Sequence, residues 1–164
     1  MPNTNVYTGA DGSLTLSPGQ GPEGDKANAV IGGYNLLTVG RVQGVKIEVR
    51  SEVRPYHEIG QRYATELRPG NVNIQGSIAR ASINGAMLRL LLGDAADSRP
   101  VGSWVQPSFN ITLLTENPAI PGLRTTMTLH DVKIDNWTYQ MPEDDFVMES
   151  VNFRALYLTV KDEG

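Results

Sequence analysis

Apolar and polar residues alternate along much of this sequence, which predicts a protein built mainly of β-strands. Between Val45 and Val49 the odd positions are apolar and the even positions are charged, as in a strand with one buried and one solvated face. The same alternation returns from Val72 to Ile78. Further strands are expected at residues 13–16, 109–113, 123–129, 132–139 and 146–160. The apolar positions change parity at His130-Asp131, which predicts a β-bulge in one long strand.

One helix is expected between Ile83 and Gly93, because apolar residues recur there at intervals of three and four. Leu88 and Leu92 widen the apolar stripe, so Arg89 is the only charged residue inside the segment. A surface helix on a lone β-domain would show a clear polar face. We therefore interpret Leu88 and Leu92 as candidate contacts with another chain. Complete burial of the helix within the monomer is the alternative.

Residues 1–28 are expected to form an extended N-terminal arm. Its segment 17–24 contains two prolines and three glycines, which disfavour regular elements. Ordering such a segment costs conformational entropy that a neighbouring subunit could offset. A free, unattached terminus is the alternative.

Residues 51–70 are expected to form a long polar loop between two strands. The charges in this stretch alternate in sign, which suits ion pairs across a subunit boundary. The alternative is a solvated loop, in which each exposed ion pair would contribute only about 0–1 kcal/mol to stability. The candidate interface residues of the loop are Arg54, Glu58, Arg62, Glu66 and Arg68.

Length and composition are consistent with one domain over residues 1–164. The chain is 40% apolar, 20% charged, has a net charge of −4 and contains no cysteine. This excludes disulfide scaffolds and thiolate chemistry, and the acidic balance argues against an extensive nucleic-acid-binding groove. No apolar run approaches the roughly 18 residues of a membrane span, and no secretory signal is visible at the N-terminus.

Three motifs that could carry chemistry are better explained structurally. Gly19–Gly24 matches G-x-G-x-x-G, but Pro22 lacks a backbone donor and no helical period follows Gly24. His57 and His130 each precede a carboxylate, without the clustered spacing of a metal site. The acidic triplet 143–145 lacks the alternating oxygen ligands of a calcium loop and is expected to be a solvated turn. We therefore expect neither a cofactor nor a metal.

The order of elements between Gly40 and Gly93 resembles that of bacteriophage tail tube proteins. The matching stretches are the strand at 45–49, then VRPYHEIG (53–60), RPGNVNIQGS (68–77) and INGAML (83–88). The resemblance implies an antiparallel β-sandwich or half-barrel with one flanking α-helix and a long inter-strand loop. It further implies six copies in a ring whose inner sheets join into one barrel, and rings that stack into a hollow tube.

The same resemblance implies a structural virion protein rather than an enzyme, made in the host bacterial cytoplasm and retained in the tail. Its partners would be copies of itself and sheath, tape-measure, baseplate and tail terminator proteins. DNA would pass transiently and non-specifically through the lumen during delivery into the host, without membrane insertion. Inward-facing acids would keep that DNA from adhering to the wall.

Two other functions stay open on the sequence. An inner tube subunit of a contractile injection or type VI secretion system would use the same kind of ring. A small ligand-binding β-barrel or enzyme would instead have a concave pocket lined by polar groups in the monomer.

Overall fold

The computed structural model describes residues 6–36, 39–100 and 102–163. The chain is 50% strand and 18% helix. In chain order the elements are the 3-10 turn η1 (Gly9–Asp11), β1 (Gly12–Pro18), α1 (Gly21–Tyr34), β2 (Val42–Tyr56), β3 (Glu66–Ala81), α2 (Ala86–Leu92), the 3-10 turn η2 (Gly93–Ala96), β4 (Phe109–Glu116), β5 (Arg124–Gln140), β6 (Met148–Ala155) and β7 (Tyr157–Glu163).

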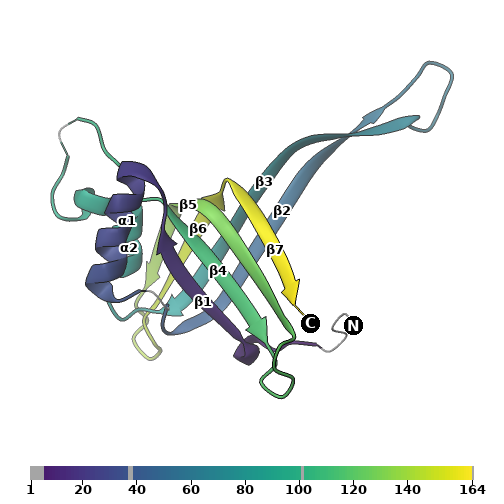
Figure 1. The fold of residues 1–164 in the computed structure, drawn as a ribbon. Helices are drawn as coiled ribbons and strands as arrows, with labels where there is room; N and C mark the ends of the chain where they lie inside the picture. Colours follow the sequence, from purple (N-terminus) through teal and green to yellow (C-terminus); the bar gives the residue numbers. More distant parts are fainter. Residues whose placement is uncertain (1–5, 37–38, 101, 164) are drawn as a thin grey trace.

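The strands form one antiparallel, curled sheet that makes a half-barrel (Figure 1). Its order is β1-β4-β5-β6-β3-β2, and β7 also pairs with β5. Strand β5 connects the two parts of the sheet, because its first half pairs with β4 and β7 and its second half with β6. The expected fold class, mainly β with a half-barrel and a flanking helix, is confirmed.

The predicted bulge at His130-Asp131 is confirmed, since β5 runs through both residues and its pairing with β4 shifts register there. Asp131 has φ 53°, a left-handed conformation that aspartate tolerates better than most residues. Its backbone N–H donates to Asn110 Oδ1 at 3.1 Å. Opposite the bulge, the expected single strand 146–160 is interrupted at Leu156 and forms two strands, β6 and β7.

The expected extended arm over residues 1–28 is wrong over its described part, residues 6–28. Residues 12–18 form β1, which pairs with β4, and helix α1 begins at Gly21. Pro22 stands in the first turn of α1, where its missing N–H has no intrahelical partner to lose. The expectation that no helix follows Gly24 is therefore also wrong; residues 1–5 lie outside the described residues.

The core lies between the concave side of the sheet and the two helices, which lie together at one end of the barrel (Figure 1). Helix α1 buries Ala27 and Ile31, and α2 buries Ala86, Met87 and Leu90. Helix α2 is the helix that the sequence predicted between Ile83 and Gly93. Its predicted end is confirmed, because Gly93 is the C-cap residue, with φ 59°. Within the described residues no helix is both long and apolar enough to cross a membrane.

The expected loop 51–70 is much shorter than predicted. Strand β2 continues to Tyr56 and β3 begins at Glu66, so only residues 57–65 connect them. The two strands pair as far as Tyr56 and Glu66, with a register shift between Ser51 and Val53. The prolines in this stretch are accommodated because a two-stranded ribbon leaves half of its backbone N–H groups unpaired.

Candidate assembly surfaces

The outer half of the β2–β3 hairpin projects away from the barrel (Figure 1). Every residue from 51 to 69 is exposed, and β6, the other neighbour of β3, is paired only as far as Ile74. An isolated two-stranded ribbon is at best marginally stable in water. The projecting part, residues 53–69, is called the distal hairpin below, and its exposure makes it a candidate contact surface.

The distal hairpin has an apolar face that the sequence analysis missed. Cross-strand pairs on this face are Val53–Pro69 and Pro55–Leu67. Val53 is 55% exposed and Leu67 is 66% exposed. The signal was present as alternation of apolar residues at 53, 55, 67 and 69, but it can be recognised only once the two segments are paired.

The opposite face of the distal hairpin is charged. Arg54 lies directly across from Arg68, and like charges in this relation destabilise a strand pair. Arg68 Nε contacts Glu66 Oε1 at 3.1 Å. For Arg54, no carboxylate oxygen of the described residues lies within 4.0 Å. The ribbon therefore presents a positive charge that its own strand pair does not compensate.

The five loop residues expected at a subunit interface all lie on this exposed hairpin. Arg54, Glu66 and Arg68 stand on its strands, and Glu58 and Arg62 stand in the 57–65 connection. Glu58 accepts a hydrogen bond from Thr65 Oγ1 at 3.3 Å. Their contact with another copy stays a prediction.

The other two candidate residues, Leu88 and Leu92, are far from the hairpin, on α2. Both are half-buried, and the Leu92 carbonyl accepts a hydrogen bond from Trp104 Nε1 at 2.6 Å. Helix α1, which the sequence analysis did not find, packs beside α2. Part of the apolar surplus of α2 is thus covered within the chain, and the proposed contact of Leu88 and Leu92 with another chain stays a prediction.

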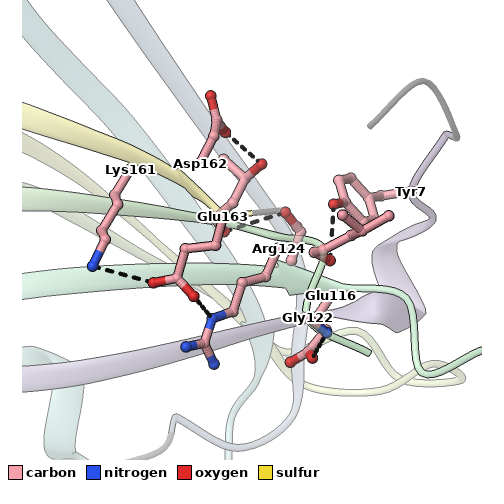
Figure 2. Close-up of polar contacts among 10 residues, drawn as sticks. Tyr7, Glu116, Gly122, Arg124, Lys161, Asp162 and Glu163 are labelled. Atoms are coloured by element: carbon pink, nitrogen blue, oxygen red, sulfur yellow. Dashed lines mark hydrogen bonds and ion pairs between the residues drawn. The ribbon is translucent and has the colours of Figure 1, made fainter. Parts of the chain in front are cut away.

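A polar network ties together the ends of β5 and β7 at the rim near the chain termini (Figure 2). Glu163 accepts from Arg124 Nε at 2.5 Å and contacts Lys161 Nζ at 3.2 Å. Beside them, Thr125 Oγ1 donates to Asp162 Oδ1 at 2.8 Å. The pKa of Glu163 is lowered mainly by the hydrogen bond from Arg124 and, to a smaller extent, by the hydrogen bond from Lys161.

The turn between β5 and β6 is acidic and apolar at once. Glu143, Asp144 and Asp145 are exposed, and Asp145 Oδ1 accepts a hydrogen bond from the Phe146 backbone at 2.7 Å. Met141 is 68% exposed and Phe146 is 77% exposed. Residues 141–146 are called the acidic turn below. No lysine or arginine of the described residues forms an ion pair with its three carboxylates.

The outward face of the sheet around β2, β3 and β6 is polar. Amide and hydroxyl side chains line it, and its charges are of both signs, including Lys46, Arg154, Glu48 and Asp135. Arg154 Nε lies 3.3 Å from Asp135 Oδ2. This face is therefore not an acidic surface.

A hollow of about 670 Å³ opens between the start of α1 and the β5 bulge. Four of its charged groups form two ion pairs, Lys133–Glu23 at 2.8 Å and Arg154–Asp135 at 3.3 Å. The described residues contain no group of three or more potential metal-binding side chains. His57 lies in the hairpin connection, and His130 is stacked on Tyr157 with ring centroids 4.2 Å apart. These observations give no catalytic arrangement among the described residues.

Comparison with solved structures identifies the class of fold. No protein-family model matches the sequence, and no curated protein matches it either. The chain is similar to a chain of the anti-feeding prophage tube-terminating cap, with a TM-score of 0.66, 8% identity, and 99% of this chain and 95% of that chain covered. It is similar to a chain of the PVC extracellular contractile injection system sheath-tube complex, with a TM-score of 0.64, 10% identity, and coverage of 97% and 93%.

A third similar structure is the SPP1 tail tube, with a TM-score of 0.59, 11% identity, and 96% of this chain and 80% of that chain covered. This chain thus shares its fold with chains of a tail tube and of an injection-system sheath-tube complex. The resemblance to tail tube proteins that residues 40–93 indicated is confirmed at the level of the fold.

Proposed function

We propose that this protein is the structural subunit of hexameric rings that stack into the hollow tail tube of a phage, through which DNA is delivered. The exposed distal hairpin carries the proposal, because a ribbon of this length without core contacts needs a second chain to cover it. The fold shared with tube proteins supports it. On this proposal residues 1–164 act as one tube domain without enzymatic activity.

The proposed partners are other copies of this chain, sheath, tape-measure, baseplate and terminator proteins, within a virion tail. We place the polar outward face of β2, β3 and β6 at the bore, because it is continuous and no helix of the described residues covers it (Figure 1). That face mixes Lys46 and Arg154 with Glu48 and Asp135. The expected repulsion of DNA by inward-facing acids therefore does not come from this face, and its amides and hydroxyls would instead give a weakly interacting wall.

Negative-stain microscopy of the concentrated protein tests the proposal. We expect rings and stacked tubes, either alone or after addition of initiating tail components. Monodisperse monomers under every condition, including with those components, would refute it.

A second candidate is the inner tube of a contractile injection system. Structural similarity favours it, since the TM-score is 0.64 with the injection-system chain and 0.59 with the SPP1 tail tube chain. Nuclease protection separates the two functions. Particles containing the native protein should hold nuclease-protected DNA if the tube belongs to a phage, and none if it belongs to an injection system.

A further inference from the structure

The distal hairpin and the acidic turn lie at opposite ends of the same strands. At one end of the sheet, β2 and β3 close at Tyr56 and Glu66. At the other end, Met148 at the start of β6 pairs with both Ala81 and Gln140. The turn at residues 141–147 therefore leaves the sheet at the end opposite to the hairpin (Figure 1).

These two ends are complementary in charge. The distal hairpin presents Arg54 facing Arg68 across the strand pair, with no carboxylate on Arg54. The acidic turn presents Glu143, Asp144 and Asp145, without an ion-pair partner among the described residues. The hairpin also carries Glu58 and Glu66, but its arginines outnumber these two carboxylates, whereas the acidic turn has no basic residue. The two ends therefore carry opposite net charges.

The two ends also match in apolar surface. Val53 and Leu67 on the hairpin, and Met141 and Phe146 on the turn, all expose more than half of their side-chain surface. Neither patch contacts the core of its own chain. Aromatic and arginine side chains are the groups most often found at the energetic centre of protein interfaces.

We propose that the distal hairpin of one copy docks on the acidic turn of a second copy. Arg54 and Arg68 then face the carboxylates of residues 143–145, and Val53 and Leu67 cover Met141 and Phe146. Because the two surfaces differ and lie at opposite ends of the strands, the contact is heterologous, and repeating it gives an open-ended, head-to-tail assembly. The inference rests on the proposed function and names the contact that joins one ring to the next.

Charge reversal tests the contact. Arg54→Glu and Asp144→Lys each place like charges at the docked ends, and neither residue supports the core. Each variant should form rings, but the association constant between rings should fall about tenfold or more. The reason is that a small free-energy penalty repeats at every copy around a ring. The combined variant Arg54→Glu/Asp144→Lys should recover association to within about twofold of the wild-type value. Arg99→Glu, an exposed arginine in the segment after η2 with the same change of charge, is the matched control and should stack normally.

Phe146→Ser tests the apolar half of the contact and should also shorten tubes while rings persist. Ring formation is read from ring views in negative stain, and association from the distribution of tube lengths. Stacking of Arg54→Glu equal to that of Arg99→Glu, or a combined variant no better than its parents, would overturn the docking contact while leaving the ring function intact. Failure of the wild-type protein to form rings at all would instead overturn the proposed function, and this contact with it.

Discussion

The buried ion pair of Arg80 and Glu149 allows a sharp test of what stabilises the barrel. Arg80 is 1% exposed and Glu149 is 2% exposed. Arg80 Nε donates to Glu149 Oε1 at 2.5 Å, and Trp137 Nε1 donates to Glu149 Oε2 at 3.0 Å. Glu149→Gln keeps the side-chain volume but leaves a buried guanidinium without a counter-charge. Breaking a buried pair in this way costs about 3–5 kcal/mol of unfolding free energy.

Urea unfolding, followed by far-UV circular dichroism at several protein concentrations, measures the loss. With an m-value of about 2 kcal/mol/M, a loss of 4 kcal/mol lowers the midpoint by about 2 M. The matched control is Asp135→Asn, which breaks the exposed Arg154–Asp135 pair and should change stability by no more than about 1 kcal/mol. Several protein concentrations are needed because self-association stabilises the folded chain by mass action.

A second variant separates a missing counter-charge from a general disturbance of the site. Arg80→Met/Glu149→Leu removes both charges and fills the space with apolar atoms, a replacement that is often neutral or stabilising. It leaves the Trp137 N–H without its acceptor, at a cost of about 1–3 kcal/mol. The double variant should therefore be more stable than Glu149→Gln. Equal losses in Glu149→Gln and Asp135→Asn, or a double variant less stable than the single one, would refute the reasoning.

Three further predictions concern the rim and the helices. Contacts to the charged carboxylate lower the pKa of Glu163, so the stabilisation that they give is present at neutral pH and is lost as pH falls through the lowered pKa. The urea midpoints of the wild type and Glu163→Gln should therefore differ at pH 7 and converge in acid. A difference that stays constant with pH would contradict this. Gly24→Ala should destabilise the fold, because the added Cβ meets a backbone carbonyl. Gly32→Ala has open space around the added Cβ in the same helix, so its unfolding free energy should rise by about 0.5–1 kcal/mol. Equal effects of the two variants in thermal melts would exclude a packing role for Gly24. Leu88→Asp should reduce assembly, as measured by sedimentation. Its unfolding free energy should fall by no more than about 1–2 kcal/mol, since Leu88 is only half-buried. A loss of several kcal/mol would place Leu88 in the core.

The sheet could be predicted because its signal is local. Alternation within a few residues marks each strand, and even the bulge at Asp131 was visible as a change of parity. Helix α1 lacks such a signal. It contains Pro22 and four glycines and buries only three small or medium residues, so its stability comes from packing on the rest of the chain. In particular, Gly24 lies against the backbone of Gly19, a contact between neighbouring elements that no periodicity reveals.

The candidate surface was only partly predictable, for a related reason. Its charged residues were recognised from composition, but the prolines and glycines in 51–70 predicted a loop where the structure has a ribbon. Gly70 is needed there because a side chain would meet the backbone carbonyl of Glu52. The pairing of Arg54 with Arg68 depends on the register shift beside Val53. Register follows from the paired strands together, so neither the charged face nor the apolar face can be derived from one strand alone.

The proposed function assigns folding and assembly to different parts of this chain. The core residues lie in the sheet and beneath the two helices, and no residue from 51 to 69 belongs to them. Substitutions in the distal hairpin therefore leave the buried apolar area of the subunit unchanged, so on the proposed function their effects fall on contacts between chains. By contrast, the ribbon itself gains no core packing in the monomer, so contact with a second copy, as proposed above, would stabilise it by mass action.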